Sequence, residues 1–324
     1  MKKIGITVLA FLLIFAFVSC EAETPAPEVV KYTVTFDSAG GSAVAPIEVE
    51  SGKVVAAPEA PEKSGYTFLE WRIGDEKYDF ASAVTKDITL KAAWKWNGIE
   101  VSDEAGLRAA VLEEGAKILI TADFSLSSVL PIEKPVSIDG NGKKISVAFN
   151  EAENTATSFY ILSSGVTVKN LILESSTDGK RDHAFFWIAT SGTEEAPIVI
   201  ENCTMDGNPL GTFTNSVVGI LTSSGDNGNY LTVRNNTIKN TKHGMYFNNI
   251  GNAVIEGNTI DTTRYNGINI AAGSKTEIKA NIIKNYAKDY TEVFDVRYSK
   301  DIYVDESATD VTVAESNSVV PADA

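Results

Sequence analysis

Apolar and polar residues alternate in a short phrase that recurs along the second half of the chain. Each copy has apolar residues in alternation, then an asparagine or a substitute for it, then a second short apolar pair. Alternation with a period of two is typical of β-strands, and asparagine is typical of a bend because it tolerates a left-handed backbone. The copies are Val168–Leu173, Ile200–Met205, Val233–Ile238, Ile255–Ile260 and Ile278–Ile283.

The spacing of these copies indicates one structural coil that is repeated. The aligned column at the bend is Leu171, Cys203, Asn236, Asn258 and Asn281, with steps of 32, 33, 22 and 23 residues. A coil of 22 to 23 residues, lengthened in some loops by about ten, accounts for all four steps. Stacked coils would place the three asparagines about 4.8 Å apart, where their amides can hydrogen-bond along the stack.

A second phrase, which has glycine as its first or second residue in three of four copies, lies between the copies of the first. It occurs at Gly219–Thr222, His243–Asn248, Asn266–Ile270 and Val293–Arg297. Each coil then contains three short strands, which predicts a parallel β-helix. A leucine-rich horseshoe is the competing solenoid, but no Leu-x-x-Leu-x-Leu pattern occurs and no coil has room for a helix.

The segment before the first copy has the features of a solenoid start. Ser102–Leu112 opens with a helix-cap signature and has an apolar stripe, so we expect a helix that covers the open end. Early strands are predicted within Lys117–Thr121 and Val136–Ile145. With the asparagine repeats, these features resemble the pectate-lyase-like right-handed β-helix superfamily over residues 98–315, which leaves 316–324 as a tail.

The front of the chain has the features of an export signal. Met1–Lys3 is charged, Ile4–Val18 is apolar and too short for a stable membrane span, and Cys20 follows. Residues 1–19 and Cys20 resemble a bacterial lipoprotein signal and its cleavage box. The resemblance implies lipid on Cys20 and anchoring in the cell envelope, facing the periplasm or the exterior; the alternative is an ordinary signal with an incidental cysteine. Residues 20–31 are acidic, contain proline and predict a tether.

Residues 32–95 have a separate pattern with several aromatic residues. Tyr32–Phe36, Gly65–Trp71 and Val84–Trp94 read as strands, with a glycine-rich turn after the first. This segment resembles the internalin B-repeat, a small β-grasp-like module, which implies a spacer or adhesive role. We expect its aromatic residues to form the core: Phe36, Tyr66, Phe68, Trp71, Phe80 and Trp94. The whole chain is thus predicted to be all-β: this module, then a right-handed parallel β-helix with an N-terminal capping helix.

Composition limits the partners. The formal net charge is −15, which argues against nucleic acid as a partner. An acidic polysaccharide would need a local basic cleft or Ca²⁺. Cys203 is the one cysteine beyond Cys20, so we expect neither a disulfide nor a cysteine metal site. We expect Cys203 to be a small buried residue of the repeat.

Candidate chemistry lies on the strand that the second phrase predicts. Alignment of Phe185–Ile188 with Met245–Asn248 predicts a row of side chains that point outward from successive coils. Its members are Phe186, Leu221, Tyr246, Asn269 and Asp295, with Asn248 and Arg297 two residues further along. The adjoining turns add Arg181, Asp182, Lys242, Arg264, Tyr265 and Asn266, and place His183 and His243 at one shared position. Aromatic, amide, carboxylate and guanidinium groups together suit sugar binding, although a solvated strand face would look similar.

Catalysis has less support in the sequence. A lyase of this superfamily needs carboxylates for Ca²⁺ and a basic residue, and a hydrolase needs aspartates grouped on successive coils. Asp206, Asp261 and Asp295 occupy different positions of the coil. We therefore expect a monomeric surface lipoprotein without a cofactor, whose β-helix binds a polysaccharide, a surface glycan or another host or envelope component. The alternatives are a polysaccharide lyase or glycoside hydrolase, for which Ca²⁺ becomes the expected cofactor, and a passive envelope spacer.

Overall fold

The computed structural model describes residues 29–147, 157–175, 183–208, 217–225, 228–286 and 300–320. The chain divides into two compact units between Lys95 and Trp96. The regular structure of the described residues is almost entirely β-strand, with one short helix, so the predicted all-β class is confirmed. The predicted signal peptide and Cys20 lie outside the described residues.

The first unit is a sheet of 5 strands in the order β2-β1-β5-β3-β4. The central neighbours β1 and β5 are parallel, and the edge pairs are antiparallel. The buried residues Phe36, Trp71 and Leu90 lie at its core, where the rings of Phe36 and Trp71 meet edge to face at 4.9 Å. The strands are β1 Lys31–Asp37, β2 Ile47–Glu50, β3 Tyr66–Ile73, β4 Glu76–Lys77 and β5 Ile88–Trp96.

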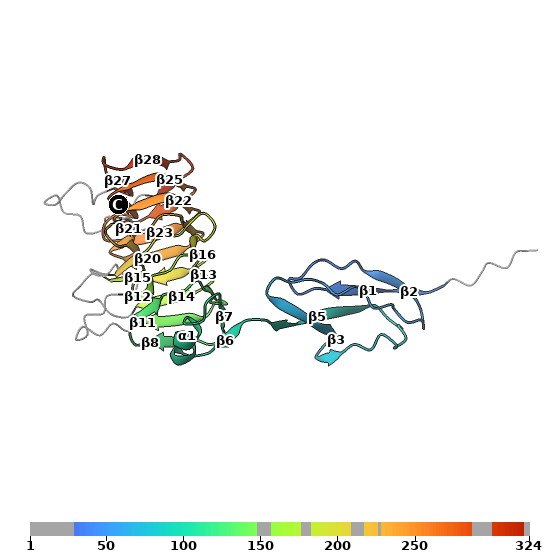
Figure 1. The fold of residues 1–324 in the computed structure, drawn as a ribbon. Coiled ribbons are helices and arrows are strands. Elements are labelled where there is room, and N and C mark those ends of the chain that lie inside the picture. The colour runs from blue at the N-terminus through green and yellow to red at the C-terminus, as the bar shows by residue number, and fades with distance from the viewer. Residues whose placement is uncertain are drawn as a thin grey trace, which may run out of the picture. The chain divides into compact units, whose positions relative to one another are not determined.

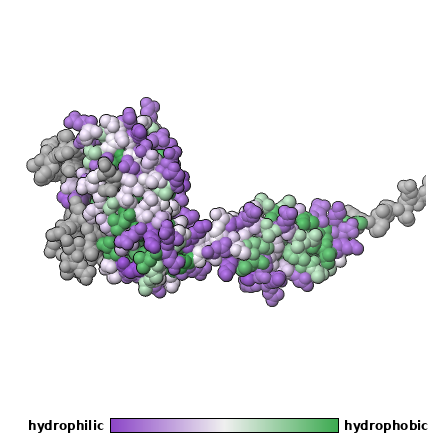
Figure 2. All heavy atoms as spheres, in the orientation of Figure 1, coloured by the Kyte–Doolittle hydropathy of each residue, from purple (hydrophilic) through white to green (hydrophobic). Residues whose placement is uncertain are grey.

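The other aromatic residues of this unit also have structural contacts. Phe68, Phe80 and Trp94 are partly buried against the core. The Lys63 ammonium lies 4.5 Å from the ring centre of Tyr66 and donates to the carbonyl of Ala39. Hydrophobic residues nevertheless reach the surface of the first unit in several places (Figure 2). The predicted core role is therefore supported for Phe68, Phe80 and Trp94, whereas Tyr66 does not belong to the core cluster.

The second unit is a solenoid of three parallel sheets. We name them the first, second and third faces, in the order in which each coil meets them. The first face has 9 strands, the second 8 and the third 7. The strand pairs of the three faces are parallel, as between β19 and β22 or between β21 and β24, and Figure 1 shows the strands stacked as rungs.

The strands of the first face are β6 Ile99–Val101, β7 Lys117–Ile120, β10 Ser137–Asp139, β13 Thr167–Lys169, β16 Ile198–Glu201, β19 Leu231–Arg234, β22 Ile250–Glu256, β25 Gly273–Lys279 and β28 Thr309–Val313. Those of the second are β8 Phe124–Leu126, β11 Lys144–Val147, β14 Ile172–Ser175, β17 Thr204–Asp206, β20 Thr237–Thr241, β23 Thr259–Thr263, β26 Ile282–Lys284 and β29 Ser318–Val320. Those of the third are β9 Leu130–Ile132, β12 Thr157–Ile161, β15 His183–Ile188, β18 Val217–Thr222, β21 His243–Phe247, β24 Ile268–Ile270 and β27 Ile302–Val304.

A short helix covers the start of the stack. α1, Glu104–Ala110, is capped by the Asp103 carboxylate, which accepts from the backbone of Gly106. Leu107 is fully buried against the first coil. Arg108 donates to the carbonyls of Ser128 and Val129, which fixes the helix to the loop beside it. The predicted capping helix is therefore confirmed.

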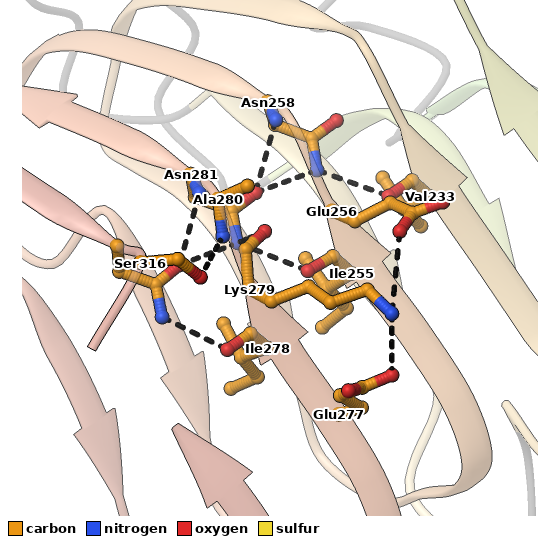
Figure 3. A network of polar contacts seen from close by, with 11 residues as sticks. Val233, Ile255, Glu256, Asn258, Glu277, Ile278, Lys279, Ala280, Asn281 and Ser316 are labelled. Atoms are coloured by element: carbon orange, nitrogen blue, oxygen red, sulfur yellow. Dashed lines mark hydrogen bonds and ion pairs between the residues drawn. The ribbon is translucent and has the colours of Figure 1, made fainter. Parts of the chain in front are cut away.

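The predicted asparagine column forms a continuous hydrogen-bonded ladder inside the solenoid (Figure 3). The Asn258 carbonyl oxygen accepts from the backbone and the side chain of Asn236, both at 3.0 Å. The Asn258 amide donates to Val233 O and to Asn281 Oδ1. Asn281 in turn bonds to Asn317, which extends the ladder by one coil beyond the sequence prediction. Each amide thus satisfies backbone groups that the bend would otherwise leave unpaired.

The residue before each ladder position has a left-handed backbone. The φ angles are 54° at Asn170, 53° at Asn202, 54° at Asn235 and 64° at Gly257. Asparagine and glycine adopt this region at low cost. Ala280 occupies the same place in its coil with a φ of 53°. Unlike asparagine or glycine, alanine does not adopt this backbone region at low cost. This alanine is therefore a point of local strain.

Ala280→Asn is expected to raise the free energy of unfolding by up to about 1 kcal/mol, because the left-handed backbone then carries a residue that tolerates it. Ala271 does not have a positive φ, so Ala271→Asn should give no gain. Chemical denaturation of the two variants measures both values. A loss of stability in Ala280→Asn would show that strain is not what limits this bend.

Ion pairs run between coils on the outer surfaces of the first and second faces. Arg234 pairs with Glu201 at 2.6 Å, and Lys239 pairs with Asp206 at 3.0 Å. The last coil also reaches further than predicted. β29 pairs with β26, so residues up to Val320 belong to the solenoid rather than to a tail that starts at 316.

Candidate ligand-binding face

The outer surface of the third face differs from the other two because one row of outward side chains, which runs from coil to coil, contains no charged residue. The register places one residue of each coil in this row, and adjacent members are strand partners. Most members are half-buried, as expected for rings that lie along a sheet surface. We name it the outer row, and its members are Pro131, Tyr160, Trp187, Leu221, Tyr246, Asn269 and Tyr303.

The outer row corrects one predicted residue. Phe186 pairs with Ile220, is fully buried and packs on Phe159 at 5.3 Å between ring centres. The predicted outward position of Phe186 is therefore wrong by one residue, and Trp187 takes its place. Trp187 contacts the Tyr160 ring at 5.9 Å and donates its indole N–H to Ser223.

The two histidines also differ in register. Val218 pairs with both Ala184 and His243, so His183 lies one residue away from the position of His243. Both histidine side chains are buried, which corrects their prediction as loop groups. Burial, together with the adjacent Lys242 cation, lowers the pKa of His243 to about 3. His243 is thus neutral at physiological pH and acts as an aromatic surface rather than a charge.

Aromatic and cationic side chains gather around His243 where the second face turns into the third. The His243 ring lies 5.2 Å from the ring of Tyr246 and 5.2 Å from that of Tyr265. Lys242 Nζ is 5.9 Å, and Arg264 Cζ is 5.1 Å, from the centre of the Tyr265 ring. The structure thus brings together three residues that the sequence predicted for a site, Tyr246, Arg264 and Tyr265.

The predicted amide residues have different roles. The Asn248 amide donates to the carbonyl of Thr222 in the preceding coil, so it supports the backbone. Asn269 belongs to the outer row but is only 2% exposed. Its amide donates to Asn266 Oδ1, while its buried carbonyl oxygen has no hydrogen-bond partner among the described residues. Buried polar atoms are rarely left unpaired, which makes this oxygen a candidate acceptor.

Most of the long connections of the solenoid lie at one corner, between the second and third faces, and two others, 189–197 and 223–230, join the third face to the first. Residues 148–156, 176–182, 207–216 and 285–301 join the second face to the third in four coils. By contrast, Lys242 alone joins β20 to β21, and 264–267 join β23 to β24. Insertions concentrated beside one face are typical of a binding surface in a solenoid. Asp295, Arg297, Arg181 and Asp182 of the prediction lie in these connections, outside the described residues.

Comparison with known proteins agrees with this architecture. Residues 32–93 match the family model of the Listeria-Bacteroides repeat domain, and residues 135–283 match that of the right-handed beta helix region. The second unit is a right-handed β-helix. The repeat domain lies within the segment predicted as an internalin B-repeat, and the β-helix match lies within the predicted range 98–315.

Two proteins of Evansella cellulosilytica are similar to parts of the chain. A putative membrane protein is 42% identical over 81 residues, which is 24% of this chain and 12% of that protein. A putative Gly-rich membrane protein is 39% identical over 121 residues, which is 36% of this chain and 13% of that protein. The matched segments thus cover a small part of these relatives. Within the described residues, no helix has the length and hydrophobicity of a membrane span.

Among the described residues, the third face of the β-helix offers few groups for acid–base chemistry. Asp206 and Asp261 lie on the second face, where Asp206 pairs with Lys239 and Asp261 accepts from Asn285. No group of three or more metal-ligating side chains occurs in the part of the chain that the structure describes. Sequence reasoning missed Tyr160, Trp187 and Tyr303. Each is an aromatic residue that alternates with apolar residues in its strand, and this pattern could have indicated an outward position.

Proposed function

We propose that this chain is a membrane-associated cell-surface protein whose β-helix binds a glycan through the outer row. The observation that carries the proposal is the uncharged aromatic row on the third face. Sugar rings present C–H groups that stack on aromatic faces, and their hydroxyls bond to amides and guanidinium groups. Tyr160 with Trp187 and Tyr246 with Tyr265 supply such faces at two places along the solenoid.

The remaining parts of the chain fit a surface location. The two relatives are named as membrane proteins, and the sequence before the repeat domain resembles a lipoprotein signal. In this proposal, lipid on Cys20 anchors the chain and residues 20–31 form a tether. The repeat domain then acts as a spacer, and the β-helix, as a monomer, carries the binding site.

Binding rather than catalysis is proposed because two described aspartates of the successive coils, Asp206 and Asp261, are engaged elsewhere. Asp206 accepts from the Asn240 amide at 2.8 Å and pairs with Lys239. Asp261 accepts from Asn285 and Thr262. These side chains stabilise neighbouring coils of the second face, so they are poorly placed to act on a sugar held on the third.

Tyr246→Ala is expected to weaken glycan binding by about 1–2 kcal/mol, because it removes a stacking ring from the outer row. The melting temperature should change little, since Tyr246 is half-buried on an outer surface. Isothermal titration with a glycan selected from an array measures the affinity. Val254→Ala is the matched control, because Val254 points outward from the first face. Equal affinities in both variants would exclude the outer row as the binding surface.

Cys20→Ser is expected to release the protein from membranes or to block its processing, because Cys20 supplies the thiol that would carry lipid. Detergent phase partition of cell extracts measures the effect. Cys203→Ser serves as the control, since Cys203 is buried in the ladder column and should not affect partition. Partition of Cys20→Ser into the detergent phase at the wild-type level would contradict the lipid anchor.

A further inference from the structure

Two cations meet on one aromatic ring at the turn between the second and third faces. Lys242 stands directly before β21, and Arg264 stands four residues before β24 in the next coil. The backbone N–H of Tyr265 donates to Lys242 O and that of Arg264 to Thr241 O, both at 2.9 Å. These hydrogen bonds hold the two turns side by side and fix the backbone positions from which the side chains of Lys242 and Arg264 extend.

The described side chains at this corner include several cations, although the chain as a whole is acidic. The net charge of the whole protein is −15, yet Lys242 and Arg264 both lie within 6 Å of the Tyr265 ring centre. Lys300 adds a third cation in the following coil, 5.8 Å from the Tyr303 ring. An anion that lies between two such cations would be stabilised by both.

The surroundings of the two cations suit a ligand that is larger than a simple ion. Beneath them, His243 is buried and neutral, so it adds an aromatic wall rather than a third charge. Tyr246 continues this wall onto the outer row, where the candidate acceptor oxygen of Asn269 follows in the next coil. Tyr160 and Trp187, at the other end of the row, have no comparable cations among the described contacts.

We infer that Lys242, Arg264 and Tyr265 form a subsite for an anionic substituent, a carboxylate or a sulfate, on the bound glycan. The planar guanidinium of Arg264 binds two oxygens of such a group side by side, and Lys242 contributes a point charge. The sugar that carries the substituent stacks on Tyr246. This inference rests on the proposed glycan-binding function and adds the charge of the ligand to it.

The test compares neutral and charged forms of the same polysaccharides. The full-length protein in detergent is titrated with cellulose, dextran and chitin derivatives, each in a hydroxyethylated, a carboxymethylated and a sulfated form. We expect a charged form to bind at least about tenfold more tightly than the neutral form of the same backbone, with an affinity that falls as salt rises. Preference for the carboxymethylated or the sulfated series tells which anion the subsite accepts.

Substitutions localise the effect. Lys242→Gln and Arg264→Gln should each reduce the preference for the charged form several-fold, and Arg264→Lys should restore it only in part. Lys169→Gln, which removes a cation on the first face, should leave the preference unchanged. Equal affinity for neutral and charged forms would overturn the anionic subsite but leave the proposed function standing. Binding of no derivative, or binding that Tyr246→Ala does not weaken, would count against both.

Discussion

Asn258→Leu is expected to lower the free energy of unfolding by roughly 3 kcal/mol, because it leaves several buried polar groups without partners. The Asn258 side chain accepts from two groups of Asn236 and donates to Val233 O and Asn281 Oδ1. Leucine fills a similar volume but forms none of these bonds. Urea denaturation, followed by circular dichroism, measures the change.

Two further variants separate hydrogen bonding from packing at this position. Asn258→Asp keeps the shape but loses the amide donors, so it should be destabilising as well. Thr259→Ala changes the next residue, which points outward and is half-buried, and should cost little. Wild-type stability in Asn258→Leu would mean that the ladder does not hold the coils together.

Gly244→Ala is expected to cost about 2–3 kcal/mol, because a methyl group at this position meets atoms that cannot move away. A Cβ on Gly244 would lie 2.5 Å from the backbone oxygen of Gly267 and 2.6 Å from Ile260 Cγ2. Gly219 has the same relation to the oxygen of Gly244 and to Ile238. The glycines of the second sequence phrase are therefore required by close packing between coils.

Gly106→Ala provides the matched control for this substitution. A Cβ on Gly106 has ordinary contacts, with the nearest atom 3.4 Å away, and the residue lies in α1. Alanine there should be neutral or stabilising, because it is the better helix former. Thermal unfolding of the two variants gives the comparison, and equal melting temperatures would refute the packing argument at Gly244.

Most of the solenoid could be predicted because its determinants are local and repeated. Asn236, Asn258 and Asn281 fall at nearly constant steps, and each lies where the alternation of apolar residues breaks. The buried amides that follow from this pattern are all present. The continuation of the ladder at Asn317 was missed because a longer connection separates it from Asn281.

The register of β15 could not be predicted in the same way. In later coils, Gly219 and Gly244 occupy one shared position near the start of the third-face strand. Phe185 stands at the place of this glycine, next to a second phenylalanine, Phe186, and both are buried. Alternation alone cannot choose between two adjacent phenylalanines, so the outward residue was assigned one position early. Trp187 emerged as a site residue only from the strand pairing.

The candidate site was predicted in part for a related reason. Tyr246, Arg264 and Tyr265 lie where the connections between the second and third faces are short. Their positions in space could therefore be predicted from their spacing in the sequence. His243 was predicted as a loop residue, but the strand begins with it and its ring is buried. The gathering of cations on Tyr265 depends on side chains from two coils, which no local pattern encodes.

Binding of glycans without their cleavage is the most direct test of this account. The full-length protein in detergent is applied to a glycan array with and without Ca²⁺, and each glycan that binds is then incubated with the protein and monitored for unsaturated or shortened products. We predict retention of at least one glycan class, loss of that retention in a Tyr246→Ala and Trp187→Ala double variant, and no product. Release of products would identify the β-helix as an enzyme, and the absence of any retained glycan would contradict the proposed binding role.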